Sequence, residues 1–347
     1  MYSEKPLLHA RQKAHRPGTL RTVALDVTSK CNMTCSKCYA ETFVNKPPLS
    51  QGQLKQALLE FYELGVFHYV MQGGEAVTDP DRLEFILKHC FPDETYINVV
   101  SNGWGITPKK IQWLKRLKVD KVAFSLDSGI AAEHDSDRLP GSYQWVMKAI
   151  DAVLNEGLLT SVSTVVTHDS LHSVGFKQAV AFVKQKKIRI DVQIAEPVGK
   201  WDGRKDMLIT PDDAAYIKQL RQELGYLPNG QAVVNRDIFS GDHDHCPAAT
   251  EFVGMSIDGE FMPCNFLQYS LGNVKDYRIA DMRLAIVGTP WFNGQQPVCI
   301  VGEDHAFIDQ FIVPYVGQDK PLDAYTVFNL QRPPQRATVW PTARWPR

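Results

Sequence analysis

The sequence has no long apolar run and no surplus of charge of either sign. No segment approaches the length of a membrane-spanning helix, and the first residues lack the apolar core of a signal peptide. The 38 basic residues nearly equal the 39 acidic ones, so the composition favours neither a nucleic acid nor a membrane as partner. Of the 347 residues, 44% are hydrophobic, which predicts a globular protein with a full core, expected in the cytoplasm.

Cysteine is also scarce, with seven residues in the whole chain. Disulfides are not expected in a reducing compartment. The cysteines divide into a group within eight residues, a single residue that is expected to pack at the end of an outer helix, and a dispersed C-terminal group: Cys31, Cys35 and Cys38; Cys90; and Cys246, Cys264 and Cys299. The two groups of three are the candidates for chemistry.

The first group stands in the stretch TSKCNMTCSKCY, directly after a predicted strand. Cysteine thiolates are the usual ligands of a 4Fe-4S cluster, and gaps of three and two residues let one loop reach three corners of it. No fourth cysteine is near, so one iron would be open to a non-protein ligand. A structural zinc loop is the alternative, although zinc sites usually pair two ligand knuckles and no second one lies beside this loop.

The same stretch resembles the radical S-adenosylmethionine (SAM) enzymes, in the T-x-x-C-N-x-x-C-x-x-C-Y form of the branch with a C-terminal auxiliary-cluster domain. Most members carry an aromatic residue before the third cysteine, where this chain has Lys37. The resemblance implies a 4Fe-4S cluster that binds SAM and an electron donor such as flavodoxin or ferredoxin. It also implies cleavage of SAM to a 5′-deoxyadenosyl radical, which abstracts hydrogen from a substrate C–H bond.

Apolar strands alternate with helical stretches over about 180 residues, which indicates an α/β fold with a parallel sheet, either barrel or doubly wound. Capping residues before Gln53, Pro80, Pro108 and Pro211 mark helix starts. The predicted strands are Thr22–Val27, Tyr69–Gln72, Tyr96–Val100, Lys121–Leu126, Thr160–Val166 and Ile188–Ile194. The resemblance implies a partial (β/α)6 TIM-type barrel with a small C-terminal α+β auxiliary-cluster domain.

Four segments are expected along the chain. Residues 1–21 are a lead-in and residues 22–227 the radical SAM barrel. A turn-rich stretch from Pro228 marks the boundary to an auxiliary-cluster domain over residues 228–312. Residues 313–347 form an extension, whose proline- and arginine-rich tail from about residue 331 is expected to be disordered.

Glycine and polar residues follow several predicted strands, at the end where β/α barrels place ligands. Taken singly, these motifs are ordinary turn chemistry. The resemblance implies that together they bind the cofactor: Tyr39, Gly73, Gly74, Glu75, Ser101, Asn102, Ser125, Asp127 and Arg138. In this assignment the Gly-Gly-Glu backbone receives the methionine amino group, and the serines, Asn102 and Asp127 lie along the ribose and substrate side.

Arg138 is assigned to the SAM carboxylate, which a planar guanidinium recognises well. The alternative is a surface arginine ahead of the next helix. Gln193 and Glu196, at the end of the sixth strand, are the catalytic candidates. They either face substrate or SAM or are edge residues of the sheet.

The second cysteine group surrounds a predicted hairpin. Asp258-Gly259 joins strands expected over Thr250–Ile257 and Glu260–Met262, which would bring Cys246 and Cys264 together. The stretch IDGEFMPCNF resembles auxiliary-cluster domains of the SPASM and twitch types, and so implies a second iron-sulfur cluster on Cys246, Cys264 and Cys299. The usual closing C-x2-C pair is missing. Either one iron is open to substrate or another residue completes the cluster: His243, His245, Asp304 or His305.

Three unrelated buried thiols are the alternative to that cluster.

Only about 20 residues precede the first strand, too few for an independent leader-binding domain. This favours a small-molecule substrate over a peptide. The shortened auxiliary domain also resembles enzymes that act on sugars, aminocyclitols and nucleosides. We therefore expect dehydrogenation or dehydration of a hydroxylated small molecule. Modification of a ribosomal peptide is the first alternative, and a non-catalytic, zinc-stabilised binding module is the second.

Overall fold

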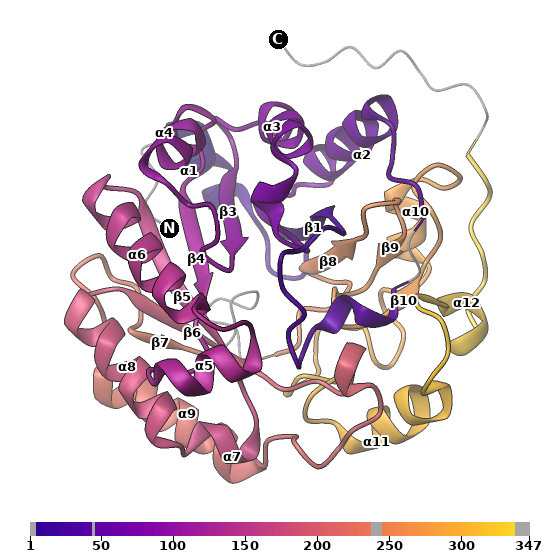
Figure 1. Ribbon diagram of the computed structural model, residues 1–347. Helices are drawn as coiled ribbons and strands as arrows, with labels where there is room; N and C mark the ends of the chain where they lie inside the picture. Colours follow the sequence, from indigo (N-terminus) through magenta and orange to yellow (C-terminus); the bar gives the residue numbers. More distant parts are fainter. Residues whose placement is uncertain (1–4, 44–45, 237–244, 337–347) are drawn as a thin grey trace.

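A single large sheet forms the centre of the computed structural model, which describes residues 5–43, 46–236 and 245–336. The described strands of this sheet follow the order β7-β6-β5-β4-β3-β2-β1-β8-β9, and β10 and β11 form a separate two-stranded sheet. Every neighbouring pair from β7 to β8 is parallel, and β8 with β9 is antiparallel. Helices surround the sheet (Figure 1). The α/β class and the partial-barrel arrangement are confirmed.

The six predicted strands are all present, and no end is shifted by more than one residue. Their apolar runs are buried because parallel strands are covered on both faces. The bounds are β1 Thr22–Thr28, β2 His68–Gly73, β3 Tyr96–Ser101, β4 Lys121–Ser125, β5 Leu159–Val166 and β6 Arg189–Ile194. Two short strands extend the sheet at its edges, β7 (Val234–Asn235) beside β6 and β8 (Phe252–Met255) beside β1.

Helices start where the capping residues predicted. Ser50 forms a capping box with Gln53, and the side chains of Asp79 and Thr107 accept hydrogen bonds from first-turn amides. The longer helices are α2 Gln51–Glu63, α3 Pro80–His89, α4 Pro108–Arg116, α5 Ala131–Asp137, α6 Ser142–Asn155, α8 Val174–Lys186 and α9 Pro211–Leu224. A four-residue helix, α7 (His168–Leu171), follows β5 directly.

The region after residue 228 is built into the barrel sheet. Residues Thr22 to Leu25 of β1 pair in parallel with Phe252 to Met255 of β8. The predicted hairpin is confirmed: β8 turns at Gly259, with φ of +95°, into β9 (Phe261–Met262). The remaining elements are β10 Tyr269–Ser270, α10 Ile279–Leu284, α11 His305–Phe307, β11 Leu322–Asp323 and α12 Ala324–Val327. The domain division stays a prediction.

A helix missed by the sequence analysis covers the start of the barrel. Helix α1 (Pro6–Ala14) buries Leu8 against Phe67, which directly precedes β2, and Tyr96, the first residue of β3. The Nζ of Lys5 lies 2.5 Å from Oδ2 of Asp120. The segment is short and basic, so its periodicity carried little signal.

At the other end of the chain, Arg336 pairs with Glu60 of α2 at 2.5 Å. The tail was predicted to be disordered from about residue 331, and its residues 337–347 lie outside the described residues. Among the described helices, none has the length and apolar character needed to cross a membrane.

Candidate functional site

A cavity of about 560 Å³ opens at the C-terminal ends of the strands. It lies within the usual size range of a small-molecule site, about 300–1,000 Å³. Nearly all of the residues predicted to bind the first cluster and SAM line it: Cys31, Cys35, Cys38, Tyr39, Gly73, Gly74, Glu75, Ser101, Asn102, Ser125 and Arg138. Gln193 and Glu196 line it as well. Asp127 is the predicted site residue that the lining lacks.

The cysteine loop is held against the end of β2 by a close backbone approach. The amide of Gly74 donates to the carbonyl of Thr28 at 2.7 Å, and the amide of Glu75 donates to the carbonyl of Lys30 at 2.8 Å. A Cβ atom added to Gly74 would lie 2.1 Å from the oxygen of Lys30. Only glycine therefore lets strand and loop pack this closely.

The three thiols of the loop share one cavity wall, and none of the seven cysteines of the chain is in a disulfide. Partial burial raises the pKa of the Cys38 thiol, and the nearby Cys35 thiol adds to this effect. Thiolates that line one cavity in this way can be stabilised by a soft cation, and thiolate is the preferred ligand of iron-sulfur clusters. The donor set and the glycine cradle beside it fit a 4Fe-4S cluster.

Glu75 connects the ends of two strands beneath the cavity. Its Oε2 accepts a hydrogen bond from the amide of Asn102 at 2.7 Å, and Nδ2 of Asn102 donates to Oδ1 of Asn32 in the cysteine loop at 2.8 Å. Burial raises the pKa of Glu75 to about 7. Glu75 and Asn102, the predicted cofactor residues that follow β2 and β3, are thus joined to the cysteine loop by direct contacts.

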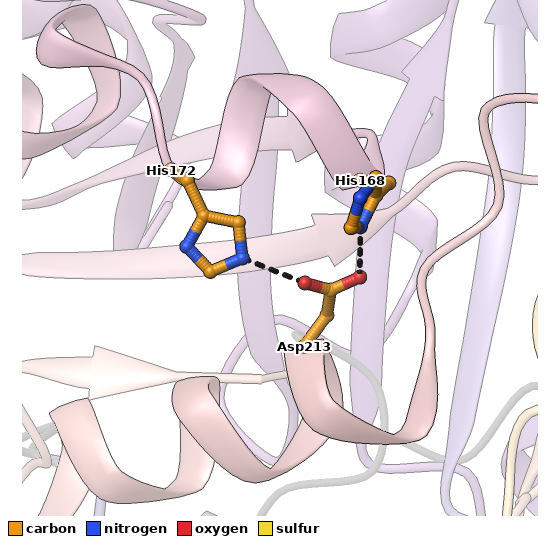
Figure 2. A group of neighbouring side chains, drawn as sticks. All are labelled: His168, His172 and Asp213. Atoms are coloured by element: carbon orange, nitrogen blue, oxygen red, sulfur yellow. Dashed lines mark hydrogen bonds and ion pairs between the residues drawn. The ribbon is translucent and has the colours of Figure 1, made fainter.

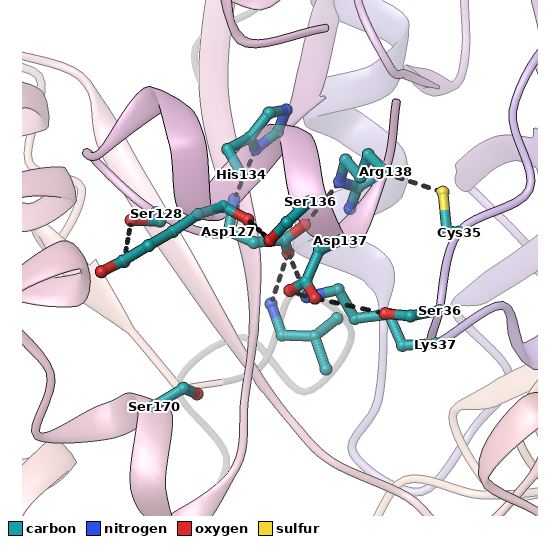
Figure 3. Close-up of polar contacts among 12 residues, drawn as sticks. Cys35, Ser36, Lys37, Asp127, Ser128, His134, Ser136, Asp137, Arg138 and Ser170 are labelled. Atoms are coloured by element: carbon teal, nitrogen blue, oxygen red, sulfur yellow. Dashed lines mark hydrogen bonds and ion pairs between the residues drawn. The ribbon is translucent and has the colours of Figure 1, made fainter. Parts of the chain in front are cut away.

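Asp127 is absent from the cavity lining and lies between two cations (Figure 3). Its carboxylate is 2.5 Å from Nε of Arg138 and 3.2 Å from Nζ of Lys37. Burial alone would raise the pKa of Asp127, but Arg138 and Lys37 outweigh it and hold that pKa well below its usual range. Arg138 and Lys37 both line the cavity while Asp127 does not, and the expected position of Asp127 along the ribose and substrate side stays a prediction.

Arg138 reaches both the buried carboxylate and the cysteine loop. Its Nη1 lies 3.8 Å from the sulfur of Cys35, and the residue also lines the cavity (Figure 3). Lys37, with a side chain only 7% exposed, makes a second ion pair with Asp137 at 3.0 Å. Lys37, at the position where most members of the resembled family have an aromatic residue, is therefore part of a buried charge network. The role of Arg138 toward the SAM carboxylate stays a prediction.

Sequence analysis missed a polar group on the inner face of the barrel. The hydroxyl of Tyr39 donates to Oδ1 of Asp26 at 3.0 Å, and Nε2 of Gln72 donates to the same oxygen at 3.3 Å. Burial raises the pKa of Asp26 to about 6, although both hydrogen bonds oppose the shift. A charged residue inside the apolar run of β1 was the available signal.

The second cysteine group lines a neighbouring cavity of about 400 Å³. Cys246, Cys264 and Cys299 are all in its lining, together with Gln193 and Glu196, which therefore border both cavities. Burial raises the pKa of the Cys299 thiol, and the other two cysteines add to the shift. Three convergent thiols again fit a soft metal centre.

The candidates for a fourth ligand of this group differ in where they lie relative to the second cavity. His245 lines the second cavity. Asp304 instead caps α11, where its Oδ1 accepts from the amide of Phe307 at 2.9 Å. His305 is exposed and absent from the cavity lining. His243 lies outside the described residues.

The amino-acid sequence is similar to those of known proteins. Residues 25–174 match the family described as the Radical SAM superfamily. A curated relative, the AdoMet-dependent heme synthase of Nitratidesulfovibrio vulgaris, is 26% identical over 308 residues, which cover 77% of this chain and 81% of the relative.

Two solved structures share the fold. That of anSMEcpe with bound AdoMet superposes with a TM-score of 0.58 and 17% identity, covering 76% of this chain and 79% of the other. Streptococcus suis SuiB bound to the precursor peptide SuiA gives a TM-score of 0.61 and 14% identity, covering 84% and 70%.

Proposed function

We propose that this chain is a radical SAM enzyme, because residues 25–174 match the model of the Radical SAM superfamily, whose members bind a 4Fe-4S cluster and SAM. Cys31, Cys35 and Cys38 hold the cluster at one wall of the first cavity. The observation that carries this assignment is that one cavity collects all three thiols and the glycine cradle of β2. When bound, cluster and SAM together supply a 5′-deoxyadenosyl radical that abstracts hydrogen from a C–H bond.

The chain's own residues bind and orient SAM in this cavity. The backbone of Gly73, Gly74 and Glu75 receives the methionine amino group, with glycine allowing the close approach. Ser101, Asn102 and Ser125 line the side of the ribose. Arg138 receives the SAM carboxylate. Two observations support this role: Arg138 lines the cavity beside Cys35, and Asp127 holds its guanidinium in place. Placement of this kind supplies much of the rate by holding reacting atoms close together.

Cys246, Cys264 and Cys299 hold a second iron-sulfur cluster in this proposal. Support comes from their convergence on one cavity and from the raised pKa of Cys299, which a cluster would relieve by binding the thiolate. His245 or substrate completes the coordination. The substrate lies at the junction of the two cavities, where Gln193 and Glu196 are within reach of both.

The substrate is a small, hydroxylated molecule that is dehydrogenated or dehydrated. The polar residues Gln193 and Glu196 at the junction suit hydrogen bonds with hydroxyl groups. A relative aligned over three quarters of the chain is named for the synthesis of a small molecule, heme. An electron donor such as flavodoxin or ferredoxin supplies the reducing electron.

Modification of a peptide is the second candidate. It is favoured by the fold similarity to SuiB, which was solved with a precursor peptide bound. That similarity has 14% identity and therefore bears on the fold more than on the substrate.

Deuterium transfer separates the two candidates. Anaerobic, reduced protein with SAM is incubated with deuterated sugars, aminocyclitols or nucleosides, and 5′-deoxyadenosine is analysed by mass spectrometry. We expect deuterium in 5′-deoxyadenosine with at least one of these substrates, and none with the Cys38→Ala variant. Transfer from candidate peptides alone would contradict the small-molecule proposal.

A further inference from the structure

Two histidines and an aspartate converge at a surface junction that the proposed chemistry does not use (Figure 2). His168 lies on α7 and His172 directly follows this helix, while Asp213 lies in the first turn of α9. Nδ1 of His168 is 2.7 Å from Oδ2 of Asp213, and Nε2 of His172 is 2.7 Å from Oδ1.

The carboxylate is fixed and the two rings are accessible. The side chain of Asp213 is 2% exposed, whereas those of His168 and His172 are 51% and 48% exposed. Oδ2 of Asp213 also accepts from the amide of Thr210 at 2.8 Å and from its hydroxyl at 2.9 Å. The ring of His172 is held against Tyr216, with centroids 4.9 Å apart. One carboxylate oxygen and two imidazoles thus lie together, with the carboxylate held by hydrogen bonds to Thr210.

This donor set suits a borderline divalent cation. Imidazole and carboxylate are the common ligands of zinc, with bonds of about 2.0–2.1 Å that set neighbouring ligand atoms about 3.3 Å apart. The three candidate ligand atoms here all lie within 4.8 Å of one another. The distances between these atoms therefore need to change by at most about 1.5 Å to accept the ion, and solvent can fill the remaining coordination positions.

We propose that His168, His172 and Asp213 form a binding site for a divalent transition-metal ion of the zinc type. The ion replaces the direct hydrogen bonds between the rings and the carboxylate, and it links α7 to the first turn of α9. This site is separate from both cysteine groups, and it stands independently of the chemistry proposed above.

The position of Asp213 connects the site to the second cavity. The residues that follow Asp213 on α9, among them Ala214, Ile217 and Arg221, line the cavity that holds Cys246, Cys264 and Cys299. Helix α7 directly follows β5, whose C-terminal half contributes Ser163 and Val165 to the first cavity. A bound ion would fix α9, which lines the second cavity, relative to the end of β5, which lines the first. Its role is structural, because the three ligands themselves lie in neither cavity lining.

Zinc binding is measured on the full chain after anaerobic loading with iron and sulfide. The wild type and the His168→Gln/His172→Gln variant are dialysed against buffered micromolar Zn2+, and metals are counted by mass spectrometry. Both proteins contain the same cysteines, so zinc taken up by thiols cancels in the comparison. His9→Gln, which alters an exposed histidine on α1, is the matched control.

We expect the wild type and His9→Gln to hold a single additional zinc ion per chain relative to the double variant. Zinc should also raise the melting temperature of the wild type but not that of the double variant, because an ion that binds only the folded state stabilises it. Protons should displace zinc as the pH falls, because imidazole binds a metal ion only in its neutral form. The single variant His172→Gln gives the same comparison if the double variant loses iron. Equal zinc in all variants would overturn the proposal and leave a hydrogen-bonded contact between α7 and α9.

Discussion

Burial of the Asp26 carboxylate makes the stability of the protein depend on pH. Its pKa is raised to about 6, so its contribution to stability is full below the unfolded value of 3.8 and is lost as the pH rises through 6. Asp26→Asn keeps an acceptor for Tyr39 without this loss. We expect the variant to gain stability over the wild type, by about 1 kcal/mol more at pH 8 than at pH 5. Denaturant unfolding of SAM-free protein at both pH values measures the difference.

The control for this variant is Asp206→Asn, at a carboxylate whose side chain is 65% exposed. It should change the free energy of unfolding by less than about 0.5 kcal/mol at both pH values. If the gain of Asp26→Asn did not depend on pH, Asp26 would not be the titrating group.

The buried Asp127 gives a second test at this scale. Arg138→Leu removes its closest cation and leaves Lys37 as partner. Removing one member of a buried ion pair typically costs about 3–5 kcal/mol, and the remaining lysine should hold the loss near the lower figure. Thermal and denaturant unfolding, with iron content as a second readout, measure the effect.

Arg204→Leu is the matched control, because Arg204 pairs with Asp206 at the surface, where both side chains are more than half exposed. Its loss should be at most about 1 kcal/mol. Equal, small losses in the two variants would mean that the network around Asp127 contributes little.

Residue types with a fixed spacing were predictable from sequence, and long-range partners were not. The three cysteines and Gly73-Gly74-Glu75 were found because each motif is local. The pairing of Lys37 with Asp127 joins residues 90 positions apart, and that of Arg138 with Cys35 spans 103. Only the packing of strands β1 to β4 brings such residues together, so their roles could not be read from spacing.

At the scale of elements, the end of β2 depends on the lack of a side chain at Gly74. Gly74→Ala would place a Cβ atom 2.1 Å from the oxygen of Lys30 and push the cysteine loop away. We expect a loss of stability of about 1–3 kcal/mol, as for other overpacked sites, and a lower iron content after reconstitution. Iron and sulfide assays combined with denaturant unfolding test this.

Gly52→Ala provides a control of the same chemical change. Gly52 lies in the first turn of α2, and a Cβ atom there meets nothing within 4 Å. This variant should be neutral or up to about 1 kcal/mol more stable, with unchanged iron content. If both variants kept their iron, the close approach of β2 to the cysteine loop would not be required for cluster binding.

Local signals predicted the regular elements well. The six barrel strands and the starts of α2, α3, α4 and α9 followed from apolar runs and capping residues. What could not be predicted was the pairing of β8 with β1, which joins segments about 230 residues apart through only four residues. A short buried strand of this kind has no periodicity of its own, and its place is decided by the open edge of β1.

At the scale of the whole molecule, the two cysteine groups should act independently. In the triple variant Cys31→Ala, Cys35→Ala, Cys38→Ala we expect iron and sulfide to remain, because Cys246, Cys264 and Cys299 line a cavity of their own. The protein should no longer cleave SAM. Cys90→Ala, at a fully buried thiol outside both cavities, should keep both iron pools. A triple variant without iron would mean that the C-terminal cysteines hold no cluster.

The most direct test of the central claim is the formation of 5′-deoxyadenosine from SAM by anaerobically reconstituted and reduced protein, followed by liquid chromatography. The wild type should form 5′-deoxyadenosine and methionine, and Cys38→Ala should form neither, because three thiolates are needed to hold the cluster in the first cavity. Tightly bound zinc in place of iron, with no 5′-deoxyadenosine, would contradict the account and favour a zinc-stabilised module.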